Sequence, residues 1–310
     1  MRVLIQNSIY ALASIHLATL PVAWQRPPHA TTTSPKAGLQ QLAIAHFIDG
    51  RLTIVEFNGS VLRSESNFYF TSSSFGPDGT RIAGNAGGQL TVLDEMFKVS
   101  WRHQSPTPNV LNVSLSHDGS QIAVVGTRKD VSRAEIWVVE AAGPQRRVYE
   151  FAYNQTRDGS CSIGWDNSGR RLAFGVESQV RILDLTNGLS KEVAAGSEAA
   201  WSPDGKRIAY RGMNGQGRVL DLDKNTDESF GKGPIVSAIH WAPNSEYLLV
   251  QEESRHKSHT DLCVSDERLV IYRLFDNFRS EVYNTCGLRD WYFGWIVGPS
   301  RWMHTFRSPR

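Results

Sequence analysis

Short apolar segments recur along the chain, and each is bounded by turn-forming residues such as Gly, Pro, Asp and Asn. Examples are Gln89–Asp94, Ala134–Val139 and Gln179–Asp184. More polar stretches, such as Gln145–Phe151 and Arg279–Thr285, follow them, as expected for outer strands whose free edge must not aggregate. Many short strands joined by tight turns predict an all-β protein.

Five segments share one pattern, in which a large apolar residue is followed by a tight turn and a short apolar strand. They are Phe75–Gly84, Leu115–Val124, Trp165–Phe174, Trp201–Tyr210 and Trp241–Val250. Their starts are spaced 40, 50, 36 and 40 residues apart, and a degenerate sixth copy begins at Trp295. A period of about 40 residues with about four strands in each unit is typical of β-propellers.

The turn residues of the repeat have separate physical roles. Proline fixes φ at the first corner, aspartate bonds to its own backbone, and glycine adopts the positive φ that other residues resist. The two most complete turns are formed by Pro77, Asp78 and Gly79 and by Pro203, Asp204 and Gly205. Trp165, Trp201 and Trp241 occupy one position in successive copies, which favours core packing over ligand stacking.

Both ends of the repeat region contain further strand-like segments. Leu42–Phe47, Arg51–Phe57 and Val61–Glu65 precede the first copy, whereas Trp291–Trp295 and Trp302–Phe306 follow the last complete one. We therefore predict a six-bladed β-propeller whose closing blade is shared by N-terminal and C-terminal strands, because such sharing removes free sheet edges. Seven blades are the alternative, in which the N-terminal strands form a blade of their own.

The segment Trp201–Leu222 resembles the Trp-Ser-Pro-Asp-Gly-Lys repeat of the TolB-like, WD-like β-propeller family. The resemblance covers about residues 39–310. It implies a periplasmic propeller that binds partner proteins. Propeller domains of prolyl oligopeptidase and dipeptidyl peptidase relatives have the same repeat, but the chain contains no Gly-x-Ser-x-Gly nucleophile motif, so we expect no peptidase activity.

Residues 1–38 differ in composition from the rest of the chain. Met1-Arg2 precedes a mostly apolar run, Val3–Trp24, and then a Pro/Thr-rich stretch, Gln25–Pro35. We interpret residues 1–38 as a signal peptide with a linker, and residues 39–310 as the propeller. This predicts a periplasmic or secreted protein. A disordered N-terminus or a misassigned start would make it cytoplasmic, and polar residues within the apolar run argue against a transmembrane span.

The charge balance limits the choice of partner. The chain has 33 basic and 31 acidic residues, a net charge of +2, and no strongly basic segment. Nucleic-acid binding is therefore not expected. No phosphate-binding or dinucleotide-binding motif is present, so we expect no cofactor, and we expect a monomer.

One face of the predicted disc carries the loops between the second and third strands of each blade. Two of these loops, Thr127–Arg133 and Glu252–Glu267, are enlarged, and long loops on a rigid scaffold often bind ligands. The candidate binding residues on this face are Arg128, Lys129, Arg133, Arg211, Asn214, Arg255, His256 and His259. Their mildly basic character suits an acidic protein segment or an anionic glycan. The alternative is that the loops are solvated and have no partner.

Metal and thiol chemistry are weakly indicated. His256, His259, Asp261 and Cys263 lie close in sequence, but in one long loop without a second cluster, so we expect no metal site. Cys263 and Cys286 can pair across a predicted hairpin, or they can be separate thiols.

The function that fits these observations is a non-catalytic binding scaffold that engages a protein or peptide at the mouth of the propeller's channel. One alternative is a propeller enzyme acting on a polysaccharide or small molecule. Converging carboxylates or a histidine cluster at the channel would favour it. The other alternative is an intracellular WD-like interaction scaffold.

Overall fold

The computed structural model describes ten stretches of the chain, all between residues 42 and 297. These stretches are residues 42–48, 51–55, 61–66, 70–128, 132–154, 161–231, 235–255, 265–276, 278–286 and 292–297. In them the regular structure consists of β-strands, with no helix. The predicted signal peptide and linker and the segment Trp302–Phe306 lie outside the described residues.

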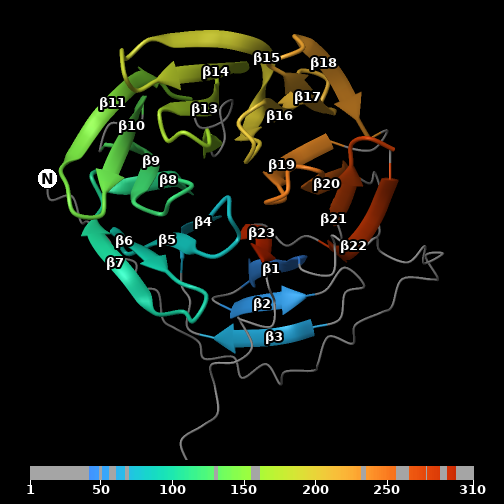
Figure 1. Ribbon diagram of the computed structural model, residues 1–310, viewed down its shortest axis with the longest axis horizontal. Coiled ribbons are helices and arrows are strands. Elements are labelled where there is room, and N and C mark those ends of the chain that lie inside the picture. Colours follow the sequence, from blue (N-terminus) through green and yellow to red (C-terminus); the bar gives the residue numbers. More distant parts are fainter. Residues whose placement is uncertain are drawn as a thin grey trace, which may run out of the picture. The chain divides into compact units, whose positions relative to one another are not determined.

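Antiparallel pairing groups the described strands into six four-stranded units, written here from the innermost strand outwards (Figure 1). Unit 1 contains β4 (Ser72–Phe75), β5 (Ile82–Ala86), β6 (Gln89–Leu93) and β7 (Val99–Gln104). Unit 2 contains β8 (Asn109–Leu115), β9 (Gln121–Thr127), β10 (Arg133–Glu140) and β11 (Gln145–Ala152). Unit 3 contains β12 (Ile163–Trp165), β13 (Arg171–Val176), β14 (Gln179–Asp184) and the first half of β15 (Ser190–Trp201).

Unit 4 contains the second half of β15, then β16 (Arg207–Gly212), β17 (Gly217–Asp221) and β18 (Thr226–Phe230). Unit 5 contains β19 (Ile235–Trp241), β20 (Tyr247–Arg255), β21 (Ser265–Arg273) and β22 (Phe278–Cys286). Unit 6 contains β23 (Tyr292–Val297), β1 (Leu42–Ile48), β2 (Arg51–Val55) and β3 (Val61–Ser66). Because β15 belongs to both unit 3 and unit 4, these two units form one continuous seven-stranded sheet.

The innermost strands contact one another in cyclic order, β4 with β8, β8 with β12, β12 with β15, β15 with β19, β19 with β23, and β23 with β4. Figure 1 shows the sheets standing around a common axis. This arrangement is a β-propeller and confirms the predicted fold class. The pairing of β1 with β23, from Leu42 opposite Val297 to Phe47 opposite Tyr292, confirms that N-terminal and C-terminal strands share a sheet. The number of blades stays a prediction.

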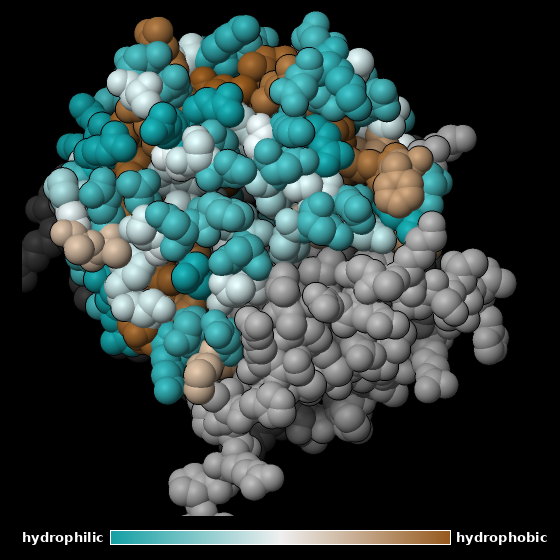
Figure 2. Space-filling model, in the orientation of Figure 1, coloured by the Kyte–Doolittle hydropathy of each residue, from teal (hydrophilic) through white to brown (hydrophobic). Residues whose placement is uncertain are grey.

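The hydrophobic core lies between neighbouring units. One cluster joins Ala83 and Val92 of unit 1 to Val113 and Val124 of unit 2, and similar clusters join units 2 and 3, 3 and 4, and 4 and 5. On the face drawn in Figure 2, hydrophilic side chains predominate among the described residues. Burial of apolar sheet faces against each other is therefore what holds the units in place.

The turns after the innermost strands have the predicted backbone conformation. The residue at the glycine position has φ between 59° and 73° in all five copies: Gly79, Gly119, Gly169, Gly205 and Ser245. The aspartate position also acts locally, since Asp78 Oδ1 accepts from the Thr80 amide at 3.0 Å, and Asp204 Oδ1 from the Lys206 amide at 3.1 Å. Each turn thus satisfies its own backbone groups.

Two of the three repeated tryptophans, Trp165 and Trp241, are hydrogen-bonded to the preceding unit. Trp165 Nε1 donates to the Ser114 carbonyl at 3.0 Å, and Trp241 Nε1 donates to the Ala200 carbonyl at 3.0 Å. Trp165, Trp201 and Trp241 are all buried, but the indole N–H of Trp201 has no hydrogen-bond partner among the described residues, so Trp201 acts by packing alone. Their position in the core therefore links the innermost strands of adjacent units.

In the described part of the chain, no helix has the length and hydrophobicity needed to cross a bilayer.

Candidate functional site

We call one end of the propeller the loop face. It carries the turns between the second and third strands of each unit, such as residues 87–88, 177–178 and 213–216. The loops on this face are shorter than predicted. Arg211 lies in β16, Arg133 in β10 and Arg255 in β20, although all three were predicted to lie in loops. The hairpins stay paired to their ends, as in the pairing of Arg211 with Gly217 and of Arg255 with Ser265.

The basic residues of unit 2 are held by acidic neighbours. Arg128 Nε lies 3.0 Å from Glu135 Oε1, and Arg133 Nε donates to Glu150. Arg147 contacts both carboxylates at 2.8 Å. Burial raises the pKa of Glu135, but hydrogen bonds from an indole and two guanidinium groups outweigh it and hold that pKa below its usual range. Arg128 and Arg133 therefore have acidic partners, although their side chains remain 64% and 59% exposed.

Several of the predicted residues cannot be placed in the site. Lys129, His256, His259 and Cys263 lie outside the described residues, so the pairing of Cys263 with Cys286 stays a prediction. Within the described residues, no three His, Cys, Asp or Glu side chains are grouped so that they could hold a metal ion.

Arg211 joins unit 4 to unit 5 at the loop face. Its Nε donates to Ser197 Oγ at 3.0 Å, and one terminal nitrogen donates to the Val236 carbonyl at 3.3 Å. The other terminal nitrogen lies 3.8 Å from Glu198 Oε1, which is beyond hydrogen-bonding distance. Of the predicted residues, Arg211 and Asn214 lie together at this junction.

The turn at residues 213–216 is fixed to the neighbouring unit. The Val236 amide donates to the Gly215 carbonyl at 2.9 Å, and the Gln216 amide donates to Asn214 Oδ1 at 3.2 Å. Met213, on the same turn, is 69% exposed. An apolar side chain is thus presented to solvent on a backbone that two units hold in place.

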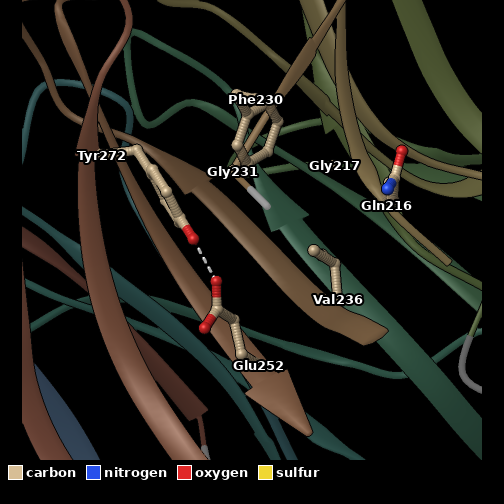
Figure 3. A pocket seen from close by; sticks show the side chains of 7 residues that line it. All are labelled: Gln216, Gly217, Phe230, Gly231, Val236, Glu252 and Tyr272. Atoms are coloured by element: carbon tan, nitrogen blue, oxygen red, sulfur yellow. Dashed lines mark hydrogen bonds between the residues drawn. The ribbon is translucent and has the colours of Figure 1, made fainter. Parts of the chain in front are cut away.

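A narrow crevice lies beside this turn, between units 4 and 5 (Figure 3). It is lined by Gln216, Gly217, Phe230, Gly231, Val236, Glu252 and Tyr272. The Glu252 side chain is buried and accepts hydrogen bonds from the Tyr272 hydroxyl and, at 2.8 Å, from Arg279. Arg279 Nε also donates to the Tyr272 oxygen at 3.1 Å. Burial, together with the bond to Glu252, raises the pKa of Tyr272 to about 12.

The crevice is packed tightly. A Cβ on Gly231 would lie 2.7 Å from the Tyr272 hydroxyl, and a Cβ on Gly217 would lie 2.3 Å from the Phe230 ring. The carboxylate of Glu252 is already satisfied by its two partners. We conclude that this network is a structural clamp between strands of unit 5. This network was not expected from the sequence, because Glu252 was predicted to lie in a loop; the available signal was the charged pair Glu252-Glu253, one residue after the apolar run that ends at Val250.

Glu198, which was not among the predicted site residues, has an unusual backbone conformation and environment. It has φ of 53°, a left-handed conformation that non-glycine residues rarely adopt, in the bulge between Ser197 and Ala200 of β15. Its side chain is 14% exposed, and burial raises the pKa of its carboxyl group despite the nearby Arg211. Strained residues with shifted pKa values cluster at functional sites, so Glu198 and Arg211 are the centre of the candidate site.

The histidine of β19 predicts a pH dependence of stability. Burial lowers the pKa of His240 from 6.5 to about 4. The unfolded chain therefore takes up the proton first, so this contribution is complete above the unfolded pKa and is lost as the pH falls toward 4. Allowing for partial exposure, we expect the wild type to lose about 2 kcal/mol more than His240→Gln between about pH 7 and about pH 4. Urea titrations of both proteins at both pH values measure this difference; equal losses would contradict it.

Comparisons with known proteins agree with the fold. No family model matches the chain. TolB from Acinetobacter baumannii is similar in structure, with a TM-score of 0.62 and 15% identity over 83% of this chain and 67% of that chain. A protein described as TolB from Agrobacterium tumefaciens has a TM-score of 0.55 and 14% identity over 83% of this chain and 98% of that chain.

Among curated proteins, dipeptidyl-peptidase 5 from Porphyromonas gingivalis is 25% identical over an aligned length of 182 residues, and the match covers 53% of this chain. The chain spans about a quarter of the length of that relative. The structural similarity to the two TolB structures shows that this chain shares their propeller fold.

Proposed function

We propose that this propeller is a non-catalytic binding scaffold that engages a protein or peptide at its loop face, at the junction of units 4 and 5. The observation that carries the proposal is the turn at residues 213–216. It presents Met213 at 69% exposure, while backbone hydrogen bonds tie the turn to β19 of the next unit. An exposed apolar side chain on a preorganised backbone loses little entropy on binding, which favours its use as an interface anchor.

The ion pairs of the loop face support binding over catalysis. Glu135 and Glu252 each accept hydrogen bonds from arginine, so both carboxylates are committed to internal partners. An acid–base pair would need a second carboxylate or a histidine beside Glu198, whose one charged neighbour among the described residues is Arg211. The structural likeness to TolB supports placing the protein in the cell envelope, which sequencing of the mature N-terminus tests: a start between residues 25 and 39 is expected after export.

Site-specific photo-crosslinking tests the binding face. A photoreactive amino acid is placed at Met213, and as control at Leu189, which is equally exposed at 69%. Leu189 lies between β14 and β15, at the opposite end of the strands from the loop face. With envelope extract of the source cells, we expect a discrete adduct from position 213 that excess unmodified protein removes by competition, and little adduct from position 189.

Equal labelling from both positions, or labelling that competitor does not reduce, would show non-specific contact and contradict the proposal. Absence of any adduct at position 213 would do the same.

A further inference from the structure

The innermost strands of the propeller are almost free of charge. They are β4, β8, β12, residues 196–201 of β15, β19 and β23. Within these described segments Glu198 is the only acidic or basic residue apart from His240, whose lowered pKa keeps it neutral at pH 7. The remaining residues are small, apolar or neutral polar. The one carboxylate on these strands has the Arg211 guanidinium of β16, 3.8 Å away, as its described opposite charge.

Glu198 also lacks the hydrogen-bond donors that the other buried carboxylates have. Among the described residues its one charged neighbour is Arg211 at 3.8 Å, and no donor there hydrogen-bonds to its carboxylate. By contrast, Glu252 accepts from Tyr272 and Arg279. A mostly buried carboxylate without donors is costly, and a donor that carries positive charge relieves that cost most.

Arg211 does not fill this role, because its hydrogen bonds are directed elsewhere. Its Nε and one terminal nitrogen donate to Ser197 Oγ and to the Val236 carbonyl. These bonds hold the guanidinium beside the carboxylate without closing a hydrogen bond between them. The carboxylate oxygens of Glu198 can therefore still accept hydrogen bonds from a group outside the chain.

We propose that the carboxylate of Glu198 accepts the side chain of a lysine or arginine from the partner peptide. The inference rests on the proposed binding function and names the chemistry of the partner at the same junction. The left-handed backbone at Glu198 fits this role: φ of 53° favours glycine, and a glutamate there carries strain that folding alone does not require.

Synthetic peptides of random sequence, acetylated at the N-terminus and amidated at the C-terminus, test the proposal because their only cations are side chains. Selection on the immobilised wild-type protein is expected to enrich lysine or arginine at one position. The affinity of the selected peptides, measured by fluorescence anisotropy, is expected to fall about tenfold or more in Glu198→Gln. The matched control is Glu192→Gln, an exposed glutamate on the outer half of β15, which should leave the affinity unchanged.

Glu198→Gly, which suits the left-handed backbone, must show the same loss as Glu198→Gln, while both variants unfold at no lower temperature than the wild type. Selected peptides without a preference for lysine or arginine, or full affinity in both variants, would overturn this inference and leave the proposed function intact. A wild-type protein that selects no peptide would overturn both.

Discussion

Replacing Glu252 with alanine is expected to lower the free energy of unfolding by about 2–3 kcal/mol, because it removes the buried carboxylate of an ion pair whose guanidinium, on Arg279, is 37% exposed. Glu252 is 1% exposed and accepts hydrogen bonds from Tyr272 and Arg279. Without the carboxylate, the guanidinium of Arg279 and the hydroxyl of Tyr272 lose their acceptor in a tightly packed region. Urea denaturation followed by tryptophan fluorescence measures the loss.

Two further variants distinguish the effect of breaking the ion pair on stability from the effect of removing any glutamate. Glu192→Ala, at an exposed position, should change the free energy of unfolding by less than about 0.5 kcal/mol. Glu252→Gln keeps an acceptor for the Tyr272 hydroxyl but leaves the charge of Arg279 uncompensated, so its loss should lie between the two. If Glu252→Ala costs no more than Glu192→Ala, the clamp does not stabilise unit 5.

The fold was predictable because each unit repeats the same local chemistry. The turn at residues 76–79 and its later copies require a positive φ at a fixed position, and that requirement is written into the sequence as glycine at Gly79, Gly119, Gly169 and Gly205. Sharing of one sheet by β1 and β23 was also predictable, because neither end of the repeat region holds a complete unit. The turn-forming residues and the number of strands at each end of the repeat region were enough to predict this architecture.

The candidate site was less predictable because it depends on contacts between units. Arg211 and Asn214 were expected on the loop face, but nothing in the sequence shows that Arg211 contacts Val236, 25 residues away, in the next unit. Glu252 was assigned to a loop because it follows an apolar run, yet strand pairing continues to Arg255. Partners distant in sequence decide whether a charge is free, and sequence patterns do not reveal them.

The left-handed backbone conformation of Glu198 was also not predictable from the sequence. A bulge appears where β15 passes from the outer edge of unit 3 to the inner edge of unit 4, and this passage has no repeated motif. In the sequence, Gly-Ser-Glu-Ala-Ala before Trp201 gives no turn signature that would indicate positive φ at a glutamate. The conformation follows from the connection between two sheets.

The second large effect on stability is expected from a substitution where β15 passes from unit 3 to unit 4. Gly196 lies at the point where β15 changes its partner from β14 to β16, with φ of 158°. A Cβ there would lie 2.2 Å from the Arg211 carbonyl oxygen and 2.8 Å from the Tyr210 ring. Because backbone cannot move aside as a flexible side chain does, Gly196→Ala is expected to lower the free energy of unfolding by about 3 kcal/mol.

Gly188→Ala is the matched control for this substitution. Gly188 has φ of 73°, but a Cβ there would meet no atom within 4 Å, so only backbone strain of about 1 kcal/mol is expected. Urea denaturation of both variants separates steric crowding from strain. Equal losses in the two would show that the passage of β15 between units relaxes around the added methyl group. A larger loss in Gly196→Ala, together with a shift of Arg211, would show that the close approach of β15 and β16 also sets the position of the candidate binding site.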